Sequence, residues 1–233
     1  MKRFTVDFET CTWLENETFV WAWAICEIGN ESNIQIGNNI DSFISQCLEN
    51  KNSIFYAHNL KFDGEFIIYW ALKNGFKHVE NIKDVESKTF TTLISDLGQF
   101  YSITLYFYKK GKHVIKLTFI DSLKILPFSV NDIAKSFNLP ISKLEIDYNK
   151  PRKRNHKLTK QEKDYITNDV KIVAMALKFM FDQKLKKMTI GSNALGYYKE
   201  LMTASKFLHY FPLLDKEIDE DLRQAYRRRI YLS

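Results

Sequence analysis

The sequence has 233 residues, of which 45% are hydrophobic and 27% are charged. These values exclude a disordered or fibrous protein and allow one large globular domain with a full core. The formal net charge of +6 favours a polyanionic partner without requiring one.

The cysteines and the apolar segments indicate the setting of the protein. Cys11, Cys26 and Cys47 are widely spaced and odd in number, which fits neither a disulfide framework nor a zinc module. No apolar run approaches the roughly 20 residues of a membrane helix, and the first residues show no targeting signal. We therefore expect a cytoplasmic protein without membrane association, in the host cytoplasm if the protein is viral.

Strands and helices alternate in the first part of the chain. Residues 3–8 alternate apolar and polar side chains, as expected for a half-buried strand. A second strand is expected over residues 19–28, and Asp41 is expected to cap a short helix through Leu48. A buried strand over residues 53–57 then precedes an amphipathic helix that ends near Gly75.

The second part predicts a hairpin followed by helices. Strand-like segments occupy residues 89–120 and include a hairpin whose turn contains Gly111. After a polar, basic stretch over residues 143–157, Thr159-Lys160-Gln161-Glu162 forms a capping box for a long helix that continues to about Lys184. Two shorter helices are expected near residues 192–210 and 216–228. The pattern predicts a mixed α/β domain with a helical C-terminal tail.

Two carboxylates on the first strand can share divalent cations. Asp7 and Glu9 are two residues apart, so both side chains leave the same face of the strand. A polar strand face explains this spacing equally well, and the pair alone is weak evidence. Asp63 lies at a strand-to-helix junction, where capping of the helix is the simpler explanation.

The long helix contributes a tyrosine and a further carboxylate. Asp169 lies beside the core stripe of this helix, where aspartate is a poor helix former, and Tyr165 is one turn earlier on the same face. Four converging carboxylates would repel one another unless cations neutralise them, which implies divalent metal. Two ions about 3.5–4 Å apart can activate water and stabilise the departing 3′ oxygen of a phosphodiester. These residues therefore predict a hydrolytic nuclease.

The order of these motifs resembles a known family. Three segments, Asp7-Phe8-Glu9-Thr10, the run from His58 to Gly64, and Tyr165-Ile166-x-Asn168-Asp169, resemble the three exonuclease motifs of the DEDDy superfamily, in its tyrosine variant. More narrowly, the chain resembles the N-terminal 3′→5′ exonuclease domain of protein-primed family B DNA polymerases of phages and linear plasmids. The segments Asp121–Lys124 and Ile146–Tyr148, together with Lys143, fit that subgroup.

The resemblance implies a fold, a cofactor and a substrate. It implies a ribonuclease H-like mixed β-sheet flanked by helices, with an exonuclease domain over residues 1–190 and a helical extension over residues 191–233. It implies a magnesium or manganese site with two ions and a DNA substrate bound by its single-stranded 3′ end. The implied metal ligands are Asp7, Glu9, Asp63 and Asp169; Tyr165 would orient the attacking water and Lys143 would contact the scissile phosphate region. The implied contacts to the 3′ end are Thr10, His58, Asn59, Phe62, Ser122, Leu123 and Tyr148.

The sequence departs from the family pattern near its end. The family has a Tyr-x-Gly-Gly segment before its polymerase domain, whereas this chain has Tyr226 followed by Arg227, Arg228 and Arg229. Arginine cannot replace glycine conformationally, and no palm aspartates follow. The expected partner is a separate polymerase subunit or a terminal priming protein, if the chain is half of a split polymerase and not a stand-alone exonuclease or an isolated domain.

Three questions stay open at the level of the sequence. An exoribonuclease of the same superfamily is one alternative, because the same site cleaves a phosphodiester whatever sugar carries it. A non-catalytic docking module is the other, although its motifs would then be retained only by descent. The basic side chains between Lys150 and Lys157 either contact DNA phosphates or are simply solvated.

Overall fold

The computed structural model describes residues 1–11, 13–14 and 17–229, with side chains described as far as residue 225. The three arginines at positions 227–229, where the sequence departs from the family pattern, therefore lie outside the described side chains. The chain forms two compact units, Met1–Ile190 and Gly191–Ser233. None of the described helices is long and apolar enough to cross a membrane.

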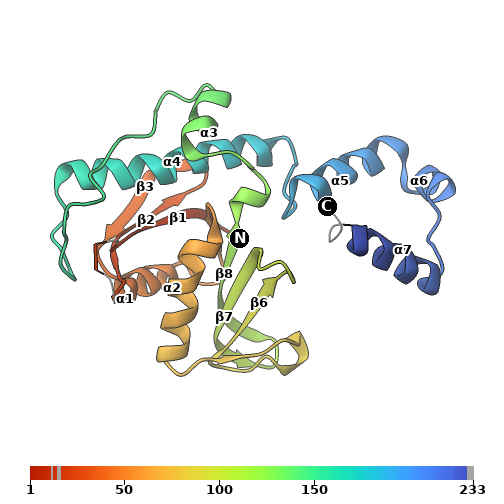
Figure 1. The fold of residues 1–233 in the computed structure, drawn as a ribbon, viewed down its shortest axis with the longest axis horizontal. Helices are drawn as coiled ribbons and strands as arrows, with labels where there is room; N and C mark the ends of the chain where they lie inside the picture. The colour runs from red at the N-terminus through yellow and green to blue at the C-terminus, as the bar shows by residue number, and fades with distance from the viewer. Residues whose placement is uncertain (12, 15–16, 230–233) are drawn as a thin grey trace. The chain divides into compact units, whose positions relative to one another are not determined.

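An eight-stranded mixed sheet forms the centre of the first unit (Figure 1). Its spatial order is β3-β2-β1-β4-β8-β7-β6-β5. The strands β1, β4 and β8 run parallel to one another, while the β1–β2–β3 and β6–β7–β8 neighbours are antiparallel. The strands are β1 (Arg3–Thr10), β2 (Val20–Glu27), β3 (Asn30–Gly37), β4 (Ile54–Ala57), β5 (Lys77–His78), β6 (Thr89–Ile94), β7 (Phe100–Lys110) and β8 (His113–Asp121).

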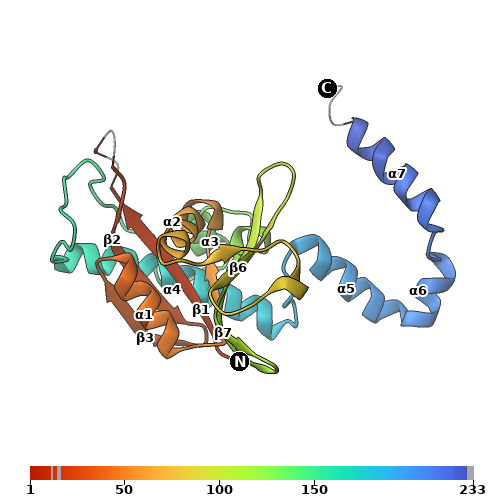
Figure 2. The same ribbon diagram turned by 90° about the horizontal axis from the view of Figure 1, so that it is seen from below.

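Helices cover both faces of this sheet, which confirms the predicted mixed α/β fold. The helices α1 (Ile40–Glu49) and α2 (Leu60–Lys73) pack on one face (Figure 2), against the apolar side chains of β1. The long helix α4 (Lys160–Asp182) packs against β1, β2 and β3 from the other face, with α3 (Val130–Ser136) beside it. The first strand is therefore buried on both sides.

The expectation of a half-buried first strand is wrong for this reason. Its polar face points toward α4 and not toward water, and Thr5 Oγ1 donates a hydrogen bond to the Val170 carbonyl over 2.8 Å. A polar strand face that a helix covers must satisfy its hydrogen bonds inside the protein. Of the two carboxylates of this face, Glu9 is therefore buried and Asp7 is partly exposed.

The local signals of two predicted elements are confirmed. Thr159 and Glu162 form the capping box at the start of α4, and the β7–β8 hairpin turns through Gly111 with φ of 57°. Asp41, in contrast, is not a helix cap. The side chain of Asn39 accepts the Ser42 N–H over 2.8 Å, so the helix begins earlier and Asp41 lies in its first turn.

The described part of the C-terminal unit, up to residue 229, contains three helices where two were expected. The predicted helix over residues 192–210 is divided into α5 (Ile190–Met202) and α6 (Ala204–Tyr210), and α7 (Lys216–Arg229) follows. Thr203 separates the first two because its φ of 67° is left-handed and cannot continue an α-helix.

A substitution of Gly37 tests how tightly the edge of the sheet is packed. Gly37 pairs with Trp23 across β2 and β3, and a Cβ at this position would lie 2.3 Å from the Trp23 ring. The ring is held by a hydrogen bond of 2.9 Å from its Nε1 to Ser42 Oγ, so it has little freedom to move. We expect Gly37→Ala to lower the free energy of unfolding by about 1–3 kcal/mol, measured by urea denaturation. Gly191→Ala is the matched control, because that Cβ meets open space, and equal stability of Gly37→Ala and wild type would contradict the packing.

Candidate active site

Three carboxylates from two elements converge between the sheet and α4. Asp7 and Glu9 come from β1 and Asp169 from α4, and one carboxylate oxygen of each lies within 4.8 Å of the others. The β1–β2 pairing shifts register between Glu9 and Thr10. Such irregularities re-aim side chains beside functional sites. The predicted convergence of these three side chains is thus present in the fold.

Asp63 lies at the edge of this group and does not cap its helix. It is only 2% exposed, and its Oδ1 accepts the Phe8 backbone N–H over 3.1 Å. The N-cap of α2 is Asn59, three residues after Tyr56 in β4 and in a left-handed conformation, and its side chain makes no capping bond. The helix-capping explanation of Asp63 is therefore wrong, and its carboxylate instead joins α2 to β1.

The burial of these carboxylates strongly favours their protonated forms. Burial, and after it the charge of Asp169, raises the pKa of Asp7 to about 7. Burial and the charge of Asp7 raise the pKa of Glu9 to about 9, and the same two causes raise the pKa of Asp63 well above its usual range. Four such groups cannot all ionise in this protein without a compensating positive charge.

Lys143 supplies part of that charge. Its Nζ lies 2.5 Å from Asp169 Oδ2, and among the described ion pairs this is the only one that involves the four carboxylates. Burial alone would lower the pKa of Lys143, but the hydrogen bond to Asp169 and the charge of Asp169, with smaller contributions from Tyr148 and Asp7, together outweigh it and the pKa is raised. One lysine still leaves the group with an excess of negative charge when the carboxylates ionise.

The donor set fits divalent cations. Asp169 Oδ1 is buried, and none of the described residues donates a hydrogen bond to it. A buried oxygen without a donor needs another partner, and a set made only of carboxylate oxygens suits Mg²⁺ or Mn²⁺. The residues present therefore fit the metal ions that the resemblance implies.

Tyr165 lies against the same group. Its side chain is buried on α4, its hydroxyl lies 2.5 Å from the hydroxyl of Tyr148, and Lys143 Nζ lies 5.2 Å from its ring centre. Burial, followed by the charge of Glu9, raises the pKa of Tyr165 above its usual value. The phenol therefore stays protonated and is able to donate a hydrogen bond.

Two of the residues expected to hold a DNA 3′ end, Asn59 and Leu123, bind a carboxylate to which the sequence assigns no role, that of Asp121. Asp121 Oδ1 accepts three backbone N–H groups, those of Asn59, Leu60 and Leu123, over 3.0–3.2 Å. This bond set ties the segment before α2 to the turn after β8. The only signal in the sequence for this role of Asp121 is its position at the end of a predicted strand, beside a motif.

These expected DNA contacts differ in exposure. Phe62 and Tyr148 are each 48% exposed, and Leu123 is partly buried. Thr10 and Ser122 are buried, and the Ser122 hydroxyl donates to the Ala57 carbonyl over 3.1 Å. His58 is held between Ser122 Oγ at 3.1 Å and the Phe128 carbonyl at 2.7 Å. Contact of each with DNA stays a prediction.

The basic stretch after Tyr148 is not uniformly solvated. Lys150, Lys153 and Lys157 are exposed, but Arg152 is buried and pairs with Glu162 through its Nε over 2.8 Å. Arg152 is therefore not available to DNA phosphates. The sequence does not predict this pairing, because an arginine within a basic loop has the pattern of a solvated one.

Comparison with known proteins places these features in a family. The family model for DNA polymerase type B, organellar and viral, matches residues 44–155 and 144–227. The DNA polymerase of Bacillus phage M2 is 42% identical over 226 residues, which cover 97% of this chain and 39% of the relative. The DNA polymerase of Streptococcus phage Cp-1 is 33% identical and is covered over 38% of its length. The chain thus spans well under half the length of these relatives.

Solved structures give the same result at the level of the fold. Phi29 DNA polymerase complexed with single-stranded DNA superimposes with a TM-score of 0.88 at 41% identity, covering 95% of this chain and 39% of that one. The ternary complex of Phi29 DNA polymerase with primer-template DNA and incoming nucleotide substrates superimposes with a TM-score of 0.86 at 41% identity. It covers 95% of this chain and 38% of that one.

The raised pKa values predict how metal-free protein responds to pH. Folded Asp7 and Glu9 bind protons up to about pH 7 and 9, whereas the unfolded chain releases them near pH 4. Their contribution to stability is therefore present below about pH 4 and is lost as pH rises through the folded pKa values. In chelator, Asp7→Asn should be more stable than wild type at pH 9, and this advantage should be clearly smaller at pH 5. A thermal unfolding difference that does not change with pH would contradict this charge arrangement.

Proposed function

The chain belongs to the DNA polymerase type B family of organelles and viruses, and we propose on that premise that residues 1–190 form a metal-dependent 3′→5′ exonuclease domain. Its proposed substrate is the single-stranded 3′ end of DNA, and its proposed setting is the cytoplasm of an infected host cell. The single observation that carries the proposal is the buried convergence of Asp7, Glu9 and Asp169, with Asp63 beside them.

The four carboxylates would hold two divalent cations. When bound, the ions supply the positive charge that activates water and stabilises the charge of the phosphodiester as it breaks. The protein contributes fixed positions for the ligands. Asp7 and Glu9 are held on a central strand, Asp169 is held on α4, and Asp63 is held by the Phe8 N–H.

Tyr165 and Lys143 would act on the reacting groups directly. The Tyr165 hydroxyl stays protonated, so it serves as an orienting hydrogen-bond partner for the attacking water and not as the base. Lys143 keeps its proton beside Asp169 and presents its ammonium group at the same site. An ammonium there attracts the phosphate at the scissile bond.

The 3′ end would be held by residues from four segments. The half-exposed rings of Phe62 and Tyr148 offer faces on which unpaired bases stack. The further residues proposed to position the nucleotides are Thr10, His58, Asn59, Ser122 and Leu123. Asp121 would act behind them by fixing the backbone of the two loops that carry Asn59 and Leu123.

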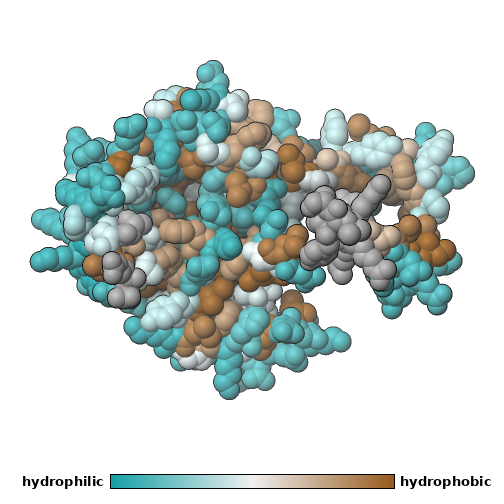
Figure 3. Space-filling view, viewed as in Figure 1, coloured by the Kyte–Doolittle hydropathy of each residue, from teal (hydrophilic) through white to brown (hydrophobic). Residues whose placement is uncertain are grey.

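The second unit is proposed to dock a polymerase. Large apolar and aromatic side chains are exposed in this unit, and Figure 3 shows brown patches on its surface. These side chains include Tyr197, Leu201, Tyr210, Leu213, Leu214 and Leu222. Exposed apolar area of this extent indicates a surface that another protein segment covers. A polymerase domain, in the same or a separate polypeptide, or a terminal priming protein is the proposed partner.

Two alternatives make different demands on the same site. An exoribonuclease would use the same carboxylates but prefer RNA, through contacts to the 2′ hydroxyl. A docking module without catalysis would need neither metal nor an intact carboxylate set. The orphaned oxygen of Asp169 favours a site that binds cations over such a module.

A degradation assay tests the nuclease directly. Single-stranded DNA labelled at its 5′ end should shorten from the 3′ end with Mg²⁺ or Mn²⁺ and stay intact in chelator. Asp7→Ala and Asp63→Ala should each lower the rate by more than the roughly 10–100-fold that outer-shell partners of metal sites contribute. Asp164→Ala, an exposed carboxylate of the same helix α4, is the matched control.

Matched RNA in that assay separates the alternatives. Faster loss of RNA than of DNA would make the chain an exoribonuclease. Intact DNA and intact RNA, with folded protein and saturating metal, would contradict the nuclease and leave the docking module.

Truncation tests the division into units. A chain that ends at Ile190 should fold, since the first unit is compact by itself, and should keep the metal-dependent activity of the full chain. It should also be less prone to self-association, because the exposed apolar helices are gone. Circular dichroism checks the fold, the nuclease assay checks the activity and sedimentation velocity checks the self-association. A folded but inactive truncated chain would contradict the proposed boundary.

A further inference from the structure

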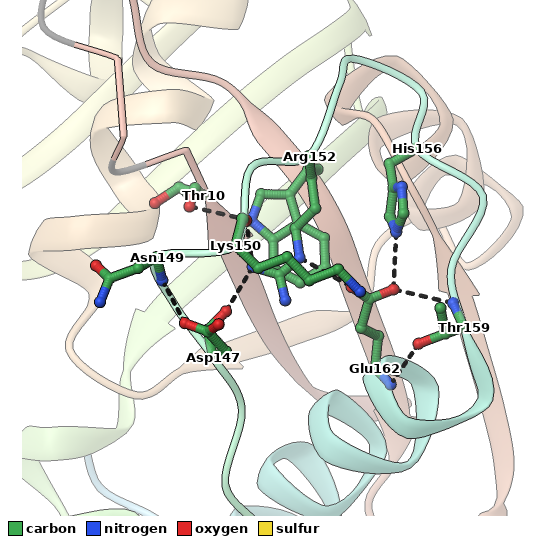
Figure 4. A network of polar contacts seen from close by, with 9 residues as sticks. Thr10, Asp147, Asn149, Lys150, Arg152, His156, Thr159 and Glu162 are labelled. Carbon is green, nitrogen blue, oxygen red and sulfur yellow. Dashed lines mark hydrogen bonds and ion pairs between the residues drawn. The ribbon is translucent and has the colours of Figure 1, made fainter.

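A buried carboxylate at the start of α4, that of Glu162, binds three residues of the loop that precedes this helix (Figure 4). Glu162 Oε1 accepts a hydrogen bond from Arg152 Nε over 2.8 Å. Its Oε2 accepts the Thr159 N–H over 2.9 Å and lies 2.8 Å from His156 Nε2. Burial by itself would raise the pKa of Glu162, but these hydrogen bonds outweigh it and lower the pKa to about 2. The carboxylate is therefore ionised at any ordinary pH.

Arg152 extends this network toward β1. Its Nη1 donates to the carbonyls of Asp147 and Lys150 over 2.8 and 2.9 Å, and its guanidinium lies 4.2 Å from the Trp21 ring centre. Trp21 in turn donates from Nε1 to the Thr10 carbonyl over 3.0 Å. One side chain thus connects β2, the loop before α4 and the first turn of α4.

The loop that Arg152 contacts carries two residues of the proposed site. The segment from Ile141 to Thr159 contains neither helix nor strand, so regular backbone pairing does not fix it. Lys143 lies near its beginning, and Tyr148 directly follows the Asp147 carbonyl that Arg152 holds. The position of Tyr148 therefore depends on side chains that bind the loop, and Arg152 binds it on both sides of this tyrosine.

Tyr148 contacts Tyr165 directly, so the position of the loop affects Tyr165. The two hydroxyl oxygens are 2.5 Å apart and the rings meet edge to face, with centres 6.3 Å apart. Tyr165 is buried on a helix, so its ring is already fixed, but its O–H group still rotates. The direction of that O–H is set by its hydrogen-bond partners, and the Tyr148 hydroxyl is one of them.

We propose that Arg152 is a positioning residue of this site: by holding the loop at Asp147 and Lys150 it places the Tyr148 hydroxyl so that the Tyr165 hydroxyl is oriented for the reaction. This inference rests on the proposed nuclease function. The described hydrogen bonds and ion pairs of Arg152 do not include the four carboxylates, on which it acts only through its charge, by lowering the pKa of Glu9. It acts through Tyr148, and lysine cannot replace it, because the contacts need a planar fork that binds a carboxylate and two carbonyls together.

A double-mutant cycle tests whether Arg152 acts through Tyr148. The variants are Arg152→Lys, Tyr148→Phe and the two combined, with kcat measured at saturating single-stranded DNA and saturating Mn²⁺. Arg152→Lys should lower kcat by about 10–100-fold, the range for groups that position a residue of a metal site without binding the metal themselves. The double variant should be no slower than the slower single variant, because both changes remove the same interaction. Glu145→Gln, an exposed side chain of the same loop, is the control and should match wild type.

Two kinetic outcomes would overturn the proposal. One is an Arg152→Lys variant with wild-type kcat. The other is a double variant whose loss equals the product of the two single losses, because Arg152 would then act by general stability and not through Tyr148. Glu162→Gln provides a second variant if Arg152→Lys folds poorly, since it keeps the shape of the network and removes its negative charge.

Hydrogen exchange separates this proposal from the nuclease proposal. In Arg152→Lys, the amides of residues 144–150 should exchange faster, while those in the middle of α4 should be unchanged. If wild type degrades no nucleic acid but this pattern is seen, the proposed nuclease function is wrong, while the proposal that Arg152 holds the loop is supported. If the exchange of residues 144–150 is unchanged, the proposal that Arg152 holds the loop is wrong, whatever the activity.

Discussion

Repulsion among buried carboxylates is the constraint on which the rest of this structure depends. Asp7, Glu9 and Asp169 lie within 4.8 Å of one another through single oxygens, Asp63 lies beside them, and Lys143 is the only described ion-pair partner. An arrangement of this kind is unfavourable in a protein without cations, because the charges repel and are removed from water. The fold therefore maintains a site whose charge balance requires something that the polypeptide does not itself supply.

The sheet and helices keep this unfavourable arrangement rigid. A strand that is covered on both faces carries Asp7 and Glu9, while α4 is anchored at its first turn by the capping box and by Arg152. The weaker part is the loop before α4, which brings Lys143 and Tyr148 to the site without regular structure. Ordered side-chain contacts replace backbone pairing there, and this makes the loop the part of the site most sensitive to single substitutions.

The sequence predicts features that depend on local chemistry better than those that depend on distant partners. The capping box at Thr159, the hairpin turn at Gly111 and the core stripe of α4 are local signals, and the structure has all of them. The burial of the polar face of β1 depends on a helix more than 150 residues away, and the roles of Asp121 and Arg152 depend on carbonyls and N–H groups that no pattern specifies. The order of the motifs in the sequence identifies the four carboxylates, but only the fold shows which of them lie close together.

Calorimetric titration of Mn²⁺ into the metal-free protein near neutral pH, in two buffers of different ionisation enthalpy, tests the central claim most directly. Carboxylates with raised pKa values must release protons when they bind a cation. The account predicts saturable binding whose heat differs between the buffers, and loss of that difference together with weaker binding in Asp7→Asn. Absence of binding, or binding with the same heat in both buffers and in the variant, would show that this group of carboxylates is not a metal site.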